Sequence, residues 1–101
     1  MEIKNAYIVN IDFDGDIKSK YCCGKRLVFT ELDEVKTVIA EALTDLMCHE
    51  KEIGRTATIE VDDGYYVPIS DVLANNQLLE RYIDVGGSYM GNWEISINKS
   101  E

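Results

Sequence analysis

The sequence predicts an α+β fold, a two-layer sandwich in which two helices pack on one face of a mostly antiparallel five-stranded sheet. Three observations lead to this expectation. Five short segments alternate apolar and polar residues, as half-buried strands do. One long segment has apolar residues at three- and four-residue spacing, as an amphipathic helix does. Asp-Gly turns join neighbouring strand-like segments. The expected order is ββαββαβ, in a single domain over residues 1–101.

The first expected strand covers residues 6–13, because every second residue from Tyr7 to Phe13 is apolar. Residues 14–16, Asp-Gly-Asp, favour a tight turn, since glycine tolerates positive φ and aspartate can bond its own backbone. Residues 17–21 then continue the spacing of two. We therefore expect residues 6–13 and 17–21 to pair as a hairpin.

A long helix is expected to begin at Thr30, whose hydroxyl can cap it with Asp33 as the reciprocal partner. Gly54 is a typical residue at which such a helix ends. The apolar positions form one stripe that can pack on the sheet. They are Leu32, Val35, Val38, Ile39, Ala42, Leu43, Leu46 and Met47.

The second half of the chain is expected to add a hairpin, a helix and a last strand. Residues 57–61 and 65–69 alternate around the turn Asp62-Asp63-Gly64. Ser70 and Asp71 can cap a helix through Ile83, with Asn75-Asn76 as a point of interruption. A glycine-flanked loop over residues 88–91 then leads to a strand over residues 93–97.

The composition indicates a folded, acidic protein. Nineteen acidic against ten basic side chains give a net charge of −9, while 46% apolar residues and one proline are globular values. Direct binding to nucleic acid or to an anionic membrane is therefore not expected, since both begin with basic side chains that neutralise phosphates. No apolar run is long enough to cross a bilayer, and residues 1–4 show no signal pattern. We expect a cytoplasmic protein of a bacterial or host cell.

The cysteines and the single histidine could supply metal ligands, but their spacing does not favour a site. Cys22 and Cys23 are adjacent and would point to opposite faces of a strand, while Cys48 and His49 form a second adjacent pair. The chain has no Cys-x-x-Cys motif. We expect reduced thiols, no bound metal and no cofactor.

Residues 8–16, an apolar strand followed by Asp-x-Asp-Gly, resemble the first motif of haloacid-dehalogenase-type phosphatases. The resemblance implies that Asp12 attacks phosphorus and Asp14 handles the leaving-group proton beside Mg²⁺, with Asp62 and Asp63 as further metal partners. The motif departs from the family at Asp16, where the family has Thr or Val. The expected strand that follows also differs from the family's crossover helix. The alternative interpretation is a strand that ends in an acidic turn.

The acidic residues are expected to gather in two groups at opposite ends of the molecule. Asp14 and Asp16 would lie with Glu50 and Glu52 at one end. Glu60, Asp62 and Asp63 would lie near Glu31, Asp33 and Glu34 at the other, with Glu41 and Asp45 between the two groups. The alternative is a solvated charged face that only keeps the protein soluble.

Tyr66 and Tyr89 are the preferred aromatic contact residues, because tyrosine is enriched where proteins bind one another. In the alternation, Tyr65 faces inward with Val67, and Tyr66 shares the outer face of Glu60. The expected partner-binding residues are Glu60, Asp62, Asp63, Tyr66, Tyr89, Asp14 and Asp16.

The function that best fits size and charge is that of a non-enzymatic inhibitor. Such a protein would mimic DNA and dock on the basic channel of a nuclease, as phage anti-defence proteins such as anti-CRISPRs do. The likeness is one of size and charge, and no residue motif links the chain to a named family. The alternatives are a bacterial immunity protein that neutralises a cognate toxin, and a small Mg²⁺-dependent phosphatase built on Asp12 and Asp14.

Overall fold

A computed structural model describes residues 6–22 and 24–100. The described elements are, in order, β1 (Ala6–Phe13), β2 (Lys25–Phe29), α1 (Leu32–Glu52), β3 (Thr58–Asp62), β4 (Tyr65–Pro68), α2 (Ile69–Ala74), α3 (Asn76–Asp84), β5 (Gly87–Met90) and β6 (Trp93–Ser100). The α+β class is confirmed. The expectations about residues 1–4 and Cys23 fall outside the described residues.

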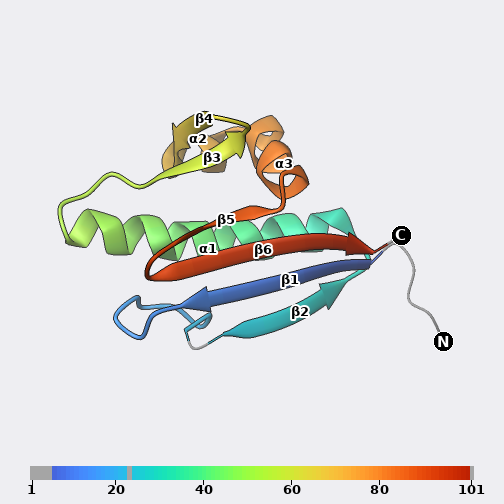
Figure 1. The fold of residues 1–101 in the computed structure, drawn as a ribbon, viewed down its shortest axis with the longest axis horizontal. Coiled ribbons are helices and arrows are strands. Elements are labelled where there is room, and N and C mark those ends of the chain that lie inside the picture. The colour runs from blue at the N-terminus through green and yellow to red at the C-terminus, as the bar shows by residue number, and fades with distance from the viewer. Residues whose placement is uncertain (1–5, 23, 101) are drawn as a thin grey trace.

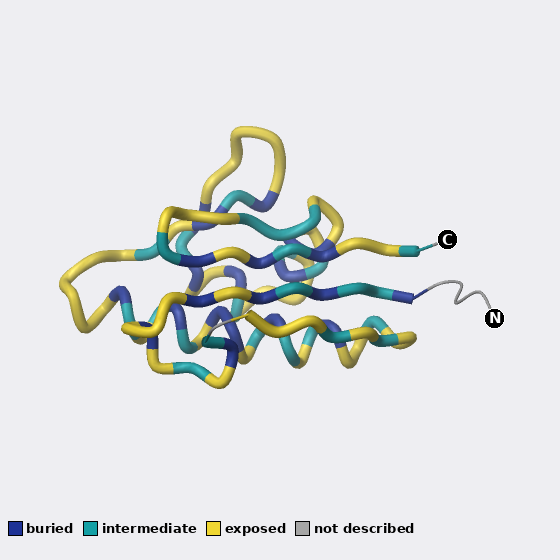
Figure 2. The backbone as a smooth tube through the Cα atoms, turned by 60° about the horizontal axis from the view of Figure 1, so that its bottom comes forward, coloured by how far each residue is buried: buried dark blue, intermediate teal, exposed yellow. Residues whose placement is uncertain are grey.

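The main layer is a four-stranded antiparallel sheet in the order β2-β1-β6-β5. β1 and β6 pair along their whole length, from Ala6 opposite Ser100 to Phe13 opposite Trp93. Helix α1 lies along one face of this sheet (Figure 1). Buried and exposed residues alternate along β1 and β6 (Figure 2), so one face packs on the helix and the other faces solvent.

The predicted five-stranded sheet is wrong, because β3 and β4 form a separate two-stranded sheet. This hairpin packs against α2 and α3 rather than pairing with the main sheet. The strand beside β6 is β5, so the expected loop over residues 88–91 is wrong in part. The two-residue turn Gly91-Asn92 joins β5 to β6, and Gly-Asn between two extended segments is a hairpin signal.

The predicted strand over residues 17–21 is also wrong, since β1 pairs with β2 instead. Ile17 and Tyr21 are nevertheless buried, so their spacing of two reflects burial from a loop. The loop is held on α1 by two hydrogen bonds. Ser19 Oγ donates to Asp45 Oδ2 at 2.7 Å, and Tyr21 Oη donates to Glu41 Oε1 at 2.7 Å.

Helix α1 buries the predicted stripe but begins differently. Its N-cap residue is Glu31, with no side-chain cap hydrogen bond, so the expected capping by Thr30 is wrong. The helix ends at Glu52, close to the expected Gly54. Its buried residues are Val35, Ile39, Ala42, Leu43, Leu46 and Glu50. Neither α1 nor either shorter described helix is long and apolar enough to cross a membrane.

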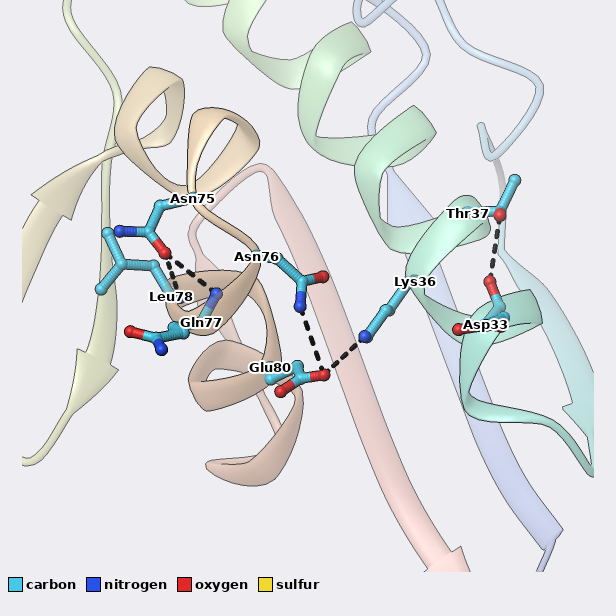
Figure 3. Close-up of polar contacts among 8 residues, drawn as sticks. All are labelled: Asp33, Lys36, Thr37, Asn75, Asn76, Gln77, Leu78 and Glu80. Carbon is cyan, nitrogen blue, oxygen red and sulfur yellow. Dashed lines mark hydrogen bonds and ion pairs between the residues drawn. The ribbon is translucent and has the colours of Figure 1, made fainter.

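The predicted second helix is divided at Asn75 into α2 and α3, as the Asn-Asn pair indicated. Asn75 Oδ1 accepts hydrogen bonds from the backbone N–H groups of Gln77 and Leu78, which caps α3 (Figure 3). An ion pair between Lys36 and Glu80 then joins α1 to α3 (Figure 3). The pair holds the pKa of the Glu80 carboxyl below its ordinary value.

Candidate partner-binding groove

A groove lies between the β3–β4 hairpin and β5. Its lining comes from residues 58–60 of β3, Tyr66 of β4, the whole of β5 and Trp93 of β6. Three of the lining side chains are unusually exposed for their size: Tyr66 at 61%, Tyr89 at 78% and Met90 at 59%. The fold therefore brings Glu60, Tyr66 and Tyr89, three of the expected contact residues, to one surface.

The acidic hairpin tip, residues 62–64, is exposed and follows the end of β3 that lies beside α3 (Figure 1). Its tight turn depends on side-chain acceptors as well as on Gly64, which has a φ of 74°. The backbone N–H of Asp63 donates to Asp62 Oδ1 at 2.9 Å, and that of Gly64 donates to Glu60 Oε2 at 3.2 Å. Two carboxylates of the hairpin, Glu60 and Asp62, thus stabilise the turn by accepting its backbone hydrogen bonds.

A bulge in β3 between Glu60 and Asp62 shifts the register of the hairpin, and both of its tyrosines are exposed. Tyr66 lies opposite Glu60, as predicted, but the shifted register places Tyr65 opposite Asp62. Tyr65 is therefore half exposed, and the expectation that it faces inward is wrong. Both rings add apolar surface at the tip.

The carboxylates at the tip have different partners. Glu60 lies opposite Tyr66, and its carboxylate raises the pKa of the Tyr66 hydroxyl, chiefly because hydrogen bonding to the carboxylate favours the protonated form. Asp62 Oδ2 lies 3.2 Å from Arg81 Nη1 of α3. No side-chain hydrogen bond or ion pair of Asp63 occurs within the part of the chain that the structure describes. Asp63 is thus the tip carboxylate most open to a partner.

Glu50 forms the floor of a second hollow that continues from the groove. Thr58, Met90 and Trp93 line both spaces, and Glu50 and Arg55 line the second. Glu50 is only 8% exposed. The expectation that Glu50 lies on an acidic surface is therefore wrong. The missed signal is its spacing, because Glu50 follows Leu43 by seven residues and Leu46 by four, so it continues the buried stripe.

The Asp14–Asp16 turn lies outside the groove. Both carboxylates are exposed, and the backbone N–H of Asp14 donates to the carbonyl of Asn92 at 3.0 Å. The turn therefore sits beside the β5–β6 turn, at the end of the sheet where Met90 and Trp93 lie. Of the expected links between two acidic groups, Glu41 and Asp45 instead hold the loop that contains Ser19 and Tyr21.

The residues of the phosphatase resemblance do not come together. Asp12 and Asp14 lie exposed at the end of β1, whereas Asp62 and Asp63 lie on the separate hairpin. Across residues 6–22 and 24–100, no three His, Cys, Asp or Glu side chains are placed so that they could hold a metal ion. β1 is followed by an antiparallel strand, whereas the family has a Rossmann-like core with a crossover helix.

Comparison with known proteins assigns no family to this chain, so the groove is interpreted from its own residues. No family model, curated protein or solved structure matches this chain. The groove combines exposed aromatic rings with the Glu60 carboxylate, and the adjoining hollow adds Glu50. Arg55 is the one basic side chain among the residues that line the two spaces. Such a surface is suited to a protein partner with basic residues.

Proposed function

We propose that this protein is a non-enzymatic acidic inhibitor, which binds the basic nucleic-acid channel of a nuclease and blocks it. The observation that carries the proposal is the placement of Glu60, Tyr66 and Tyr89 on one groove, next to the acidic tip that bears Asp63. Exposed aromatic rings supply the desolvated anchors of many interfaces. Carboxylates around them supply the attraction to basic residues.

Electrostatics explain why a nuclease is the proposed partner. A channel that binds phosphates presents a positive field, which would attract a protein of net charge −9 as it attracts DNA. The net negative charge of the chain also repels other acidic surfaces of the cell, which favours a basic partner. An inhibitor of this kind needs no reactive residue, because it acts by occupying the channel.

The partner can be sought by immobilising the chain, capturing proteins from a bacterial lysate and identifying them by mass spectrometry. Each captured nuclease is then assayed for cleavage of a fluorescent DNA duplex with and without the chain. We expect inhibition that excess DNA relieves. Captured nucleases that cleave normally, or partners that handle no nucleic acid, would contradict the proposal.

The association rates of charge-reversal variants test whether the hairpin tip, rather than another acidic part of the surface, attracts the partner. Asp63→Lys should slow association about tenfold and change dissociation little, because it reverses a long-range attraction. The same reversal at Glu34, an exposed residue in the first turn of α1, is the matched control and should have a smaller effect. Asp14→Lys with Asp16→Lys reports on the other turn. Association that is equal at about 50 and about 300 mM salt would exclude electrostatic docking.

A further inference from the structure

Helix α1 ends its buried stripe with a carboxylate. The other buried positions of the stripe are apolar, whereas the Glu50 side chain carries a carboxylate and is 11% exposed. A carboxylate in such a place is costly unless donors surround it. Yet Glu50 Oε2 accepts no hydrogen bond from the described residues.

Arg55 is the nearest cation, and it satisfies Glu50 only in part. Its Nε lies 3.4 Å from Glu50 Oε2, as an ion pair without a hydrogen bond, and its side chain is 67% exposed. Arg55 belongs to the segment between α1 and β3, outside any helix or strand. Arg55 therefore approaches Glu50 from the solvent, where a cation of a partner protein can replace it.

The hollow above Glu50 opens into the groove along two strands. β3 and β5 are in contact, but no backbone hydrogen bond joins them among the residues described. At about 3.3 Å per residue, the four residues of β5 make a wall about 13 Å long. A segment of three or four extended residues matches this length.

We propose that the groove receives an extended, basic segment of a partner protein, with one arginine or lysine side chain bound at the Glu50 carboxylate. Charge complementarity selects this occupant: Glu50 and Glu60 are the charged groups of the lining apart from Arg55. Met90 and Trp93 line the hollow beside Glu50 and can contact the apolar stem of the basic side chain, whereas the exposed rings of Tyr66 and Tyr89 line the groove that would hold the rest of the segment. The inference rests on the proposed function in taking the partner to be a basic protein.

A basic side chain of the partner that binds Glu50 Oε2 takes the position that Arg55 Nε holds, so the two cations compete for one carboxylate oxygen. A guanidinium from the partner that donates directly to Glu50 Oε2 replaces an ion pair that makes no hydrogen bond. Arg55→Ala should therefore tighten binding by about threefold, because it removes the competitor. If Arg55 is instead the structural partner of Glu50, the same change should only destabilise the fold.

The test uses the full chain and an end-blocked pentapeptide, Thr-Val-Arg-Val-Thr, with Trp93 as the fluorescent reporter. Trp93 is the single tryptophan and lines both spaces. The control peptide has citrulline, an uncharged isostere, in place of arginine. We expect the arginine peptide to change the Trp93 emission and the citrulline peptide to bind at least about tenfold more weakly.

Glu50→Gln removes the charge and keeps the shape, and it should weaken the arginine peptide about tenfold. Glu52→Gln, two residues further along α1 and exposed, is the matched control and should change binding less than about twofold. Circular dichroism establishes that each variant is folded. Equal binding of both peptides, equal binding to Glu50→Gln, or no binding to wild type and Arg55→Ala at about 5 mM peptide would overturn the inference.

The captured nuclease separates this inference from the proposed function. Full inhibition by Glu50→Gln, with salt-sensitive docking through Asp63, would overturn the groove assignment and leave the inhibitor proposal standing. Binding of the arginine peptide at Glu50 without inhibition of any captured nuclease would support the groove and contradict the inhibitor proposal.

Discussion

The carboxylates at the hairpin tip, Glu60, Asp62 and Asp63, have different interaction partners within the fold. Glu60 supports the turn through Gly64 and lies opposite Tyr66, and Asp62 pairs with Arg81. Reversing either charge would disturb the hairpin as well as any partner. Asp63 can be changed at less structural cost, since its own side chain is exposed and joins no other element that the structure describes. Charge tests of function therefore belong at Asp63.

The contact between Glu60 and Tyr66 predicts a measurable shift. The Glu60 carboxylate stabilises the protonated hydroxyl of Tyr66, so the pKa of Tyr66 is raised, with a smaller contribution from the charge of Asp63. Glu60→Gln should lower this pKa toward its ordinary value of about 10. Asp63→Asn should lower it less. The values can be followed by NMR during a pH titration, and a pKa unchanged by Glu60→Gln would mean that the two side chains do not meet in solution.

Among the elements, β5 depends most on a single residue. Gly87 lies opposite Ser96 at the start of the strand and has a φ of 91°. A Cβ atom at this position would lie 2.1 Å from the carbonyl oxygen of Ile95, which is backbone and cannot move aside easily. Glycine at position 87 is thus what allows β5 to approach β6 and to form one wall of the groove.

Gly87→Ala should destabilise the protein by about 3 kcal/mol, since it combines a positive φ with a backbone clash. Gly91→Ala is the matched control within the same hairpin, because nothing lies within 4 Å of a Cβ there. Urea denaturation of both variants gives the comparison. Equal stability of the two would show that β5 does not pack on β6 as closely as the structure describes.

Side-chain contacts hold together the two sheets and three helices of the described residues. Tyr82 of α3 is fully buried, and its hydroxyl lies 2.8 Å from Ser88 Oγ of β5. Burial raises the pKa of Tyr82, because the low-polarity interior disfavours the phenolate. This tyrosine therefore couples the stability of the fold to alkaline pH.

The sign of the coupling follows from the direction of the shift. The unfolded chain loses the Tyr82 proton near the ordinary pKa of about 10, and the folded chain keeps it to higher pH. The stabilisation is complete below about pH 10 and falls by about 1.4 kcal/mol per pH unit above it. Tyr82→Phe should cost about 1 kcal/mol at neutral pH and flatten this fall.

Denaturant titrations at several values between about pH 9 and pH 11.5 measure the slope. Tyr89→Phe removes a hydroxyl from an exposed ring and is the matched control. A slope in Tyr82→Phe as steep as in the wild type would mean that Tyr82 is accessible to solvent in the folded protein.

The sequence alone determined the elements whose signal is local. The stripe from Val35 to Leu46 predicted a buried helix, and the turn at residues 62–64 predicted a hairpin. The alternation in β1 and β6 predicted half-buried strands correctly. Exposed acids at Asp14, Asp16 and Asp63 followed from their place in turns. Each of these features depends on neighbours within a few residues.

Only the tertiary structure decided which strand edges meet and what lies between them. Periodicity reports that one face is buried, but it does not report the hydrogen-bonding partner, so residues 17–21 resembled a strand and β5 resembled a loop. Tyr66 and Tyr89 share a groove because the hairpin stays separate from the main sheet. Glu50 lies in one hollow with Met90 and Trp93, which are forty and forty-three residues further along the chain, and no local pattern reports that proximity.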